Sequence, residues 1–204
     1  SKPICSPFHK ETSLGYRQDL VMAHPFDLDK AKSLLEKAGV KNLEMTTHVT
    51  PRWPQMKLFC LIWQQDLAKI GVKLTVNEVE VARFYEVGQD AKLLGFDVYP
   101  WLNGRTARDP AIFLGTQLNY RGGATNRYKW VNPEIEKLVA DAAIELDIEK
   151  RRKMYQRCNE ILVDELPMIQ VATDPRVWAF STKVKGVNFD MNGNLLLEKA
   201  WLDK

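Results

Sequence analysis

Apolar residues repeat at two different spacings in the first part of the chain. Leucine and alanine recur at helical spacing over Leu28–Ala38, with Asp27 before them as an N-cap and Gly39 after them as a stop. The segment Leu43–Val49 instead alternates apolar with polar residues, which is typical of a strand. The two spacings therefore predict a helix and then a strand.

The alternation of helix and strand continues up to residue 99. The predicted elements are a helix over Gln55–Ile70, a strand over Val72–Val76, a helix over Val81–Lys92 and a strand over Phe96–Tyr99. Helices of this length between short strands imply that the strands pair in parallel through right-handed crossovers. The predicted fold class is therefore α/β, with a mostly parallel sheet flanked by helices.

The second part of the chain has a mainly helical pattern. Asn132 is placed as a cap and Pro133 as the first residue of one helix. A second helix is predicted over Asp147–Leu166, and strands are predicted over 168–172 and 177–181. This part of the chain therefore supplies a pair of helices that is followed by strands.

Both ends of the sequence lack an obvious partner. Residues 1–24 carry Pro3 and Pro7 and few periodic apolar positions, which indicates an extended connector that needs something else to lie against. Near the C-terminus, Leu195–Leu197 and Trp201 are apolar and have no partner in the rest of the pattern. A discontinuous domain, from which the middle of a longer chain loops out as a second lobe, would explain both ends.

Composition excludes several classes of protein. The 204 residues are 45% hydrophobic and 27% charged, which is enough apolar material for a real core and too little charge for disorder. The net charge is +3, and basic residues are interspersed with acidic ones, so nothing indicates nucleic-acid binding. The best apolar stretch, Leu58–Ile70, contains four polar residues, so no membrane-spanning helix is predicted.

Residues with catalytic or metal-binding chemistry are scattered along the chain. The three cysteines form no CxxC pair, and the three histidines have no carboxylate or cysteine at ligand spacing. No Gly-x-Ser-x-Gly elbow occurs. The sequence therefore predicts no enzyme, no cofactor and no metal site. The scattered residues are Cys5, Cys60, Cys158, His9, His24 and His48.

Six segments carry a resemblance to a known family by their order and spacing. They are Phe26–Gly39, Trp101–Leu114, Asn126–Pro133, Arg151–Tyr155, Glu165–Ile169 and Val184–Val187. Together they resemble the C-terminal portion of extracellular solute-binding proteins of family 5, the peptide, nickel and opine class that feeds ABC importers. The resemblance covers nearly the whole chain.

This resemblance implies a periplasmic-binding-protein-like lobe. It places a connector from a missing N-terminal lobe at 1–24, the C-terminal ligand-binding lobe at 25–174 and a return segment to the missing lobe at 175–204. The two lobes would close over a small peptide-like or anionic solute and deliver it to a membrane permease, in the periplasm or outside the cell. Because the chain opens at Ser1 without a charged and apolar leader, any export signal has been removed or was never in this sequence.

One loop combines aromatic, amide and guanidinium groups beyond the C-terminal end of a predicted strand, the edge where open α/β sheets bind ligands. Trp101 offers a flat apolar platform, and Arg105 offers a planar fork that matches a carboxylate. The alternative is that Trp101 packs under the loop and that Asp109 only caps a short helix over 110–114. The candidate ligand-binding residues of this loop are Trp101, Asn103, Arg105, Arg108 and Asp109.

A second loop, around Gly122 and Gly123, adds three candidates, although it could be an ordinary surface loop. The remaining aromatic residues, among them Trp53 and Trp63, are expected in the core or in interfaces. The candidates of the second loop are Tyr120, Arg121 and Asn126.

The first loop departs from the pattern of the peptide-binding members of this family. Those proteins carry an Asp-Tyr-x-Asp-Pro type loop whose first aspartate captures the α-amino group of the peptide, whereas this chain has Asn103–Thr106 and a longer run before Asp109. A cationic Arg105 has the wrong sign for an ammonium group. The loop therefore favours a solute that presents an anion. A signalling or chaperone-like binding module with the same fold is the alternative function.

Overall fold

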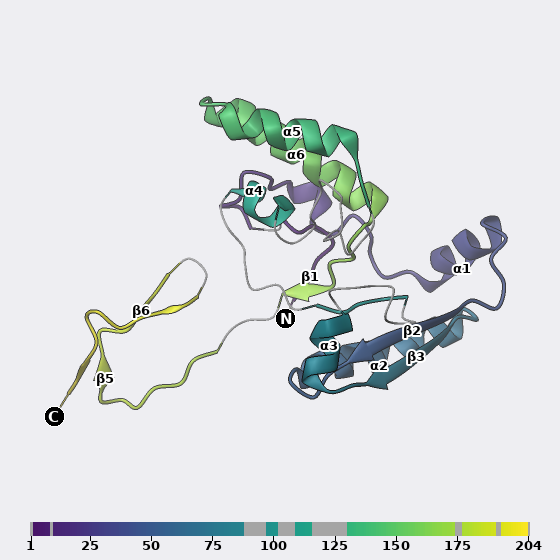
Figure 1. Cartoon of the computed structure of the whole chain (residues 1–204), viewed down its shortest axis with the longest axis horizontal. Coiled ribbons are helices and arrows are strands. Elements are labelled where there is room, and N and C mark those ends of the chain that lie inside the picture. Colours follow the sequence, from purple (N-terminus) through teal and green to yellow (C-terminus); the bar gives the residue numbers. More distant parts are fainter. Residues whose placement is uncertain are drawn as a thin grey trace. The chain divides into compact units, whose positions relative to one another are not determined.

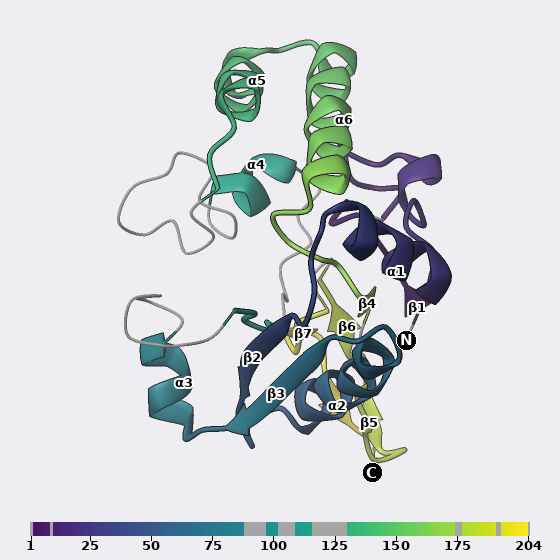
Figure 2. The same ribbon diagram turned by 90° about the vertical axis from the view of Figure 1, so that its right-hand side faces the viewer.

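The structure is a computed structural model of the whole chain. It describes residues 2–8, 10–87, 97–101, 109–115, 130–173, 177–190 and 193–203. The chain divides into two compact units, one made of Pro25–Asn103 and one made of Ser1–His24 together with Gly104–Lys204. Figures 1 and 2 label their helices and strands.

The unit Pro25–Asn103 alternates helices with parallel strands, as its sequence pattern predicts. Its elements are α1 (Leu28–Lys37), β2 (Glu44–Val49), α2 (Pro54–Lys69), β3 (Lys73–Glu78) and α3 (Val81–Val87). β2 and β3 pair in parallel along their whole length, and Val98 adds a parallel bridge to Thr47 on β2. Figure 2 shows β2 and β3 side by side. The predicted parallel pairing is therefore confirmed.

Local signals explain where these elements begin and end. The Asp27 side chain accepts a hydrogen bond from the Lys30 amide at the start of α1, and Gly39 takes a left-handed φ of 68° after its end. Gly71 does the same after α2, with a φ of 79°. Between α2 and the strands lies an apolar core whose buried members are Val49, Met56, Cys60 and Phe84.

The second unit is built around a pair of helices. Its elements are β1 (Lys2–Pro3), η1 (Gln18–Leu20), α4 (Pro110–Phe113), α5 (Pro133–Ile144), α6 (Ile148–Glu165) and β4 (Ala172–Thr173). The predicted cap at Asn132 is confirmed, since its side chain accepts from the Ile135 amide, and α6 is capped by Asp147, whose side chain accepts from the amides of Glu149 and Lys150. The buried core of this unit is Phe8, Leu14, Phe113, Leu114, Ile135, Val139, Ala142, Tyr155, Cys158, Ile161 and Leu162.

The first 24 residues are anchored on α6. The wholly buried Asn159 accepts a hydrogen bond from the Ser6 hydroxyl at 2.9 Å and donates one to the Gly15 carbonyl at 2.9 Å. Backbone bonds also pair β1 antiparallel with β4. The expected connector therefore finds its contacts within this chain, and its assignment to a missing lobe stays a prediction.

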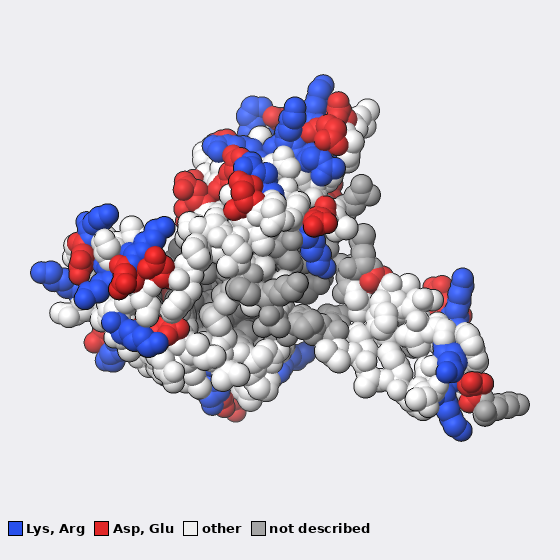
Figure 3. Space-filling model, turned by 180° about the vertical axis from the view of Figure 1, so that it is seen from behind, with Lys and Arg blue, Asp and Glu red and all other residues white. Residues whose placement is uncertain are grey.

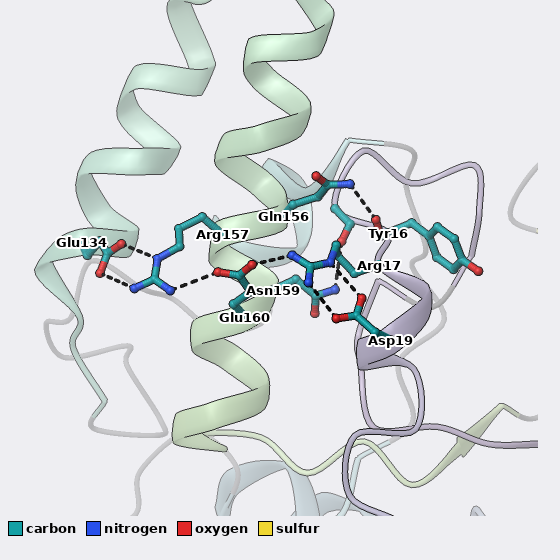
Figure 4. A network of polar contacts seen from close by, with 9 residues as sticks. Tyr16, Arg17, Asp19, Glu134, Gln156, Arg157, Asn159 and Glu160 are labelled. Carbon is teal, nitrogen blue, oxygen red and sulfur yellow. Dashed lines mark hydrogen bonds and ion pairs between the residues drawn. The ribbon is translucent and has the colours of Figure 1, made fainter.

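Ion pairs extend this anchor over the surface of the helices. Arg17 pairs with Asp19 at 2.7 Å and with Glu160 on α6, while Arg157 pairs with Glu160 at 3.0 Å and with Glu134 on α5 at 2.7 Å. Figure 4 shows this chain of alternating charges, which joins the N-terminal segment to both helices. More broadly, Figure 3 shows acidic and basic side chains interspersed on the face that it draws.

The C-terminal segment forms two short antiparallel pairs. β5 (Val184–Lys185) pairs with β8 (Trp201–Leu202), and β6 (Asn188–Phe189) pairs with β7 (Leu195–Leu196) across a connection of which residues 191 and 192 lie outside the described residues. Gly186 has a φ of 71°, and a Cβ there would lie 2.0 Å from the Lys199 carbonyl oxygen. The close approach of β5 to the chain before β8 therefore needs glycine.

Two predicted strands differ from the structure. Residues 177–181 form no strand, and the strand expected over 168–172 is reduced to Ala172–Thr173. Both predictions came from the apolar pattern alone, and a strand exists only where another backbone can pair with it. The assignment of 175–204 to a missing lobe stays a prediction. No helix among the described residues combines the length and the apolar character that crossing a membrane requires.

Candidate functional site

Five aromatic side chains gather at the carboxyl ends of the parallel strands. We call Trp53, Phe84, Tyr85, Tyr99 and Trp101 the aromatic cluster. Trp53 lies between β2 and α2, Phe84 and Tyr85 lie on α3 directly after β3, and Tyr99 and Trp101 follow the bridge at Val98. Because parallel strands end at the same edge, the three connections bring these rings together.

The rings pack in a regular arrangement. Trp53, Tyr85 and Trp101 contact one another edge to face, with centroids 5.8 to 6.1 Å apart and interplanar angles of 73 to 80°. Tyr99 stacks on Trp101 at 5.9 Å and on Phe84 at 4.8 Å, and its hydroxyl donates to the Phe84 carbonyl at 3.2 Å. Edge-to-face and stacked pairs of this kind fix the ring positions.

Exposure rises across the aromatic cluster from its base to its rim. Phe84 is wholly buried, Trp53, Tyr85 and Tyr99 are half-buried, and 38% of Trp101 is exposed. The guanidinium of Arg52 lies 5.6 Å from the centre of the Trp53 ring, within the range of a cation–π contact. The edge therefore offers a preformed aromatic surface with a cation beside it.

Such a surface suits recognition of an organic solute. Aromatic rings supply contact area at a low cost in conformational entropy, and a guanidinium can meet a carboxylate with two parallel hydrogen bonds. Among the described residues, no group of three or more His, Cys, Asp or Glu side chains is placed to hold a metal ion.

Two buried thiols, Cys60 in the unit Pro25–Asn103 and Cys158 in the helical unit, are poor nucleophiles. Burial raises the pKa of the Cys60 thiol, which lies in the core beneath the strands. Burial, aided by Glu134, raises the pKa of Cys158 to about 12. Both thiols therefore stay protonated near neutral pH, where the thiolate is the reactive form.

The structure places one predicted site residue in the aromatic cluster. Trp101 is the most exposed ring there, as its expected role as a platform requires. The other candidates, apart from Asp109, lie outside the described residues, so their contact with a solute stays a prediction. These are Asn103, Arg105, Arg108, Tyr120, Arg121 and Asn126.

Asp109 has a structural position in the helical unit. Its side chain accepts a hydrogen bond from the Ala111 amide at 2.9 Å and so caps α4, and it forms an ion pair with Arg151 on α6. Burial and the neighbouring Asp109 raise the pKa of Tyr155 to about 12. These contacts fit the alternative that Asp109 is a cap, and a contact between Asp109 and a solute stays a prediction.

Sequence reasoning passed over four residues of this edge. The sequence did not single out Arg52, Tyr85 and Tyr99 as candidate ligand-binding residues, and it predicted Trp53 to lie in the core or in an interface. The signal was present, since Arg52 and Trp53 follow the predicted strand Leu43–Val49 just as Trp101 follows the predicted strand Phe96–Tyr99. Extending the strand-edge argument to every connection would have found them.

Comparison with known proteins gives a consistent set of matches. The model of the bacterial extracellular solute-binding proteins, family 5 Middle, matches residues 2–125. Di/tripeptide-binding protein 4 of Pseudomonas aeruginosa is 28% identical over 182 residues, covering 84% of this chain and 32% of that protein. The peptide transport periplasmic protein SapA of Salmonella typhimurium is 27% identical over 177 residues, covering 83% of this chain and 31% of that protein.

Solved structures agree on the fold. HbpA2 from Haemophilus parasuis matches with a TM-score of 0.76 and 26% identity, covering all of this chain and 41% of its own. A dipeptide-binding protein from Pseudoalteromonas also reaches 0.76 at 23% identity, over 99% of this chain and 41% of its own. The chain therefore has the fold of part of these proteins, and it spans about a third of the length of the curated relatives that it matches.

Proposed function

The chain belongs to the bacterial extracellular solute-binding proteins of family 5, and on that premise we propose that it is part of the substrate-binding component of an ABC importer. The protein captures a small peptide-like or anionic solute outside the cytoplasmic membrane, in the periplasm or at the cell surface. Its partner is the membrane permease of the importer. Its relatives are solute-binding proteins, and binding rather than catalysis is its activity.

The observation that carries this proposal is the aromatic cluster with Arg52. Three separate connections converge on the carboxyl edge of parallel strands, where α/β folds bind ligands. Their rings hold one another in place before any solute arrives, so little ordering entropy is lost on binding. A solute side chain resting on Trp101 and Trp53 would bring its anionic group within reach of Arg52.

The same proposal assigns each part of the chain to a lobe or to a connection between lobes. Residues 25–174 form the C-terminal lobe, and the segments 1–24 and 175–204 connect it to a first lobe that lies in another part of the full-length protein. Exposed side chains such as Phe180 at 43% and Leu202 at 73% support this role for the C-terminal segment. The two lobes would enclose the solute by a hinge motion.

The solute class is peptide-like with an anionic end. Relatives are named for dipeptides and tripeptides, which favours a peptide backbone. The guanidinium of Arg52 and, as predicted from the sequence, that of Arg105 favour a carboxylate over an ammonium group on this lobe.

The direct experiment is native mass spectrometry of the full-length protein, followed by calorimetric titration with the solute that it retains. Trp101→Ala and Arg105→Ala should each weaken the affinity by about tenfold or more. Trp63→Ala is the matched control, because Trp63 stacks on Phe59 about 15 Å along α2 from Trp53. Unchanged affinity in both site variants would refute the site, and the absence of any retained or bound solute would refute the function.

A further inference from the structure

Two tyrosine hydroxyls in the aromatic cluster differ in their hydrogen bonding. The Tyr99 hydroxyl donates to the Phe84 carbonyl at 3.2 Å. The Tyr85 hydroxyl has no hydrogen-bond partner among the residues that the structure describes. Both side chains are half-buried in the same cluster, so the difference does not follow from their burial.

The hydrogen bond made by Tyr99 belongs to the fold. Phe84 lies in the last turn of α3, where backbone carbonyls have no partner within the helix. The Tyr99 hydroxyl supplies a donor for one of them and so ties α3 to the chain that follows the bridge at Val98. This hydroxyl therefore has a structural role, which the Tyr85 hydroxyl lacks.

The Tyr85 ring is held in place on three sides. Its centroid lies 5.9 Å from that of Trp53 and 6.1 Å from those of Trp101 and Phe84, with interplanar angles of 73 to 82°. Edge-to-face contacts of this kind favour one orientation of the ring. The hydroxyl is therefore positioned before a solute arrives, and little conformational entropy is lost when it forms a hydrogen bond.

The groups around Tyr85 leave its hydroxyl available. Arg83 and Glu86, which flank it on α3, pair with each other at 2.7 Å. Arg52 lies over the Trp53 ring, and it has no ion pair in the described part of the chain. One indole therefore contacts both a guanidinium and a phenol ring whose polar groups the described fold does not use.

A guanidinium and a phenol suit different groups of a solute. The guanidinium matches a carboxylate, because it is charged and can donate two parallel hydrogen bonds. The phenol donates a single O–H, which suits the carbonyl oxygen of an amide. A solute with a carboxylate but no amide would leave the phenol without a partner once the two lobes close, and an unpaired polar group costs binding free energy.

We propose that the Tyr85 hydroxyl donates to a backbone carbonyl of the solute and thereby selects peptides over other organic anions, an inference that rests on the proposed function. The aromatic rings hold the solute by contact area, whereas the Tyr85 hydroxyl reads the amide. Tyr85 is therefore a residue that determines specificity.

The experiment compares two variants that each lose one hydroxyl. Full-length protein is freed of retained solute in urea, refolded, and titrated in a calorimeter with the tightest binder from a mixture of dipeptides and tripeptides. Tyr85→Phe should weaken affinity by about fivefold or more and leave the free energy of unfolding unchanged. Tyr99→Phe is the matched control, because its hydroxyl bonds the Phe84 carbonyl, and it should lower stability while affinity stays within about twofold. Wild-type affinity in Tyr85→Phe would overturn the proposal.

A second measurement identifies the group that Tyr85 contacts. The same peptide is compared with analogues in which one amide at a time is replaced by a trans-alkene, which removes the carbonyl. At one position the replacement should weaken binding to the wild type about fivefold more than binding to Tyr85→Phe, because only the wild type loses a hydrogen bond there. Equal losses in the two proteins at every position would overturn the proposal, even if Tyr85→Phe binds weakly.

The outcomes separate this proposal from the function on which it rests. A wild-type protein that binds no solute of any class refutes the proposed function itself. Binding that is weakened by Trp101→Ala but not by Tyr85→Phe refutes the role of Tyr85 alone. Binding of organic anions that have no amide, at the affinity of the best peptide, leaves solute capture in place and refutes selection by Tyr85.

Discussion

The polar side chains of the helical unit and the aromatic side chains of the unit Pro25–Asn103 have different roles. In the helical unit, Asn159 binds the Ser6 and Gly15 segment, and ion pairs tie Arg17 to Glu160, so polar groups serve to hold chain segments together. In the unit Pro25–Asn103, the aromatic cluster ends in the exposed Trp101, and the described residues give Arg52 no ion pair. The helical unit is therefore organised around its own contacts, whereas the unit Pro25–Asn103 leaves an aromatic surface exposed.

The strongest test of this comparison breaks the anchor in the helical unit. Asn159→Ala leaves the Ser6 hydroxyl and the Gly15 carbonyl without their buried partner, so the free energy of unfolding should fall by about 3 kcal/mol. Urea denaturation followed by circular dichroism measures the change. Gln156→Ala, which removes a partly buried bond to the Tyr16 carbonyl, serves as the milder control. A loss smaller than that of the control would contradict the role given to Asn159.

The complementary test is made in the unit Pro25–Asn103. Arg52→Met removes the cation beside Trp53 and should weaken solute affinity by about tenfold, with little change in the free energy of unfolding. Arg152→Met on α6, which breaks an ion pair with Glu149 at 3.2 Å, should leave solute affinity unchanged. Calorimetric titration of both full-length variants measures their solute affinities. Equal losses of affinity in Arg52→Met and Arg152→Met would refute the claim that only the unit Pro25–Asn103 contacts the solute.

A finer test separates support from contact within the aromatic cluster. Tyr99→Phe keeps the stacked ring and removes the hydrogen bond to the Phe84 carbonyl, so the free energy of unfolding should fall by about 1 kcal/mol. Solute affinity should stay within about twofold of the wild type, since the ring surface is retained. A large loss of affinity with no loss of stability would instead make the hydroxyl a ligand contact.

The smallest expected effect concerns the exposed ion pairs of the helical unit. The hydrogen bond from Arg157 lowers the pKa of Glu134 below its ordinary value of 4.5. A lowered carboxyl pKa stabilises the fold above the ordinary pKa, and this contribution is lost as the pH falls through the folded-state value. Arg157→Met should therefore flatten the fall in unfolding free energy below about pH 4.5, as measured by denaturation at pH 3 and pH 6. An unchanged slope would show that other carboxylates set the acid response.

Local signals in the sequence predicted much of the fold correctly. The caps at Asp27 and Asn132 and the stop at Gly39 are short-range features whose hydrogen bonds close within three residues. Parallel pairing also followed, because a long helix between two short strands leaves little other choice. The strand expected over 177–181 was wrong, since no local pattern shows whether a second backbone will lie beside it.

The sequence by itself determined the alternation of helices and parallel strands in the unit Pro25–Asn103 and the caps at Asp27 and Asn132, since these depend on side-chain periodicity and on backbone groups a few residues apart. Only the tertiary structure decided that Trp53, Tyr85 and Trp101 share one surface and that Ser6 is held by Asn159, far along the chain. Such contacts depend on how strands and helices pack across long separations in sequence. Packing brings together residues whose local patterns carry no sign of one another.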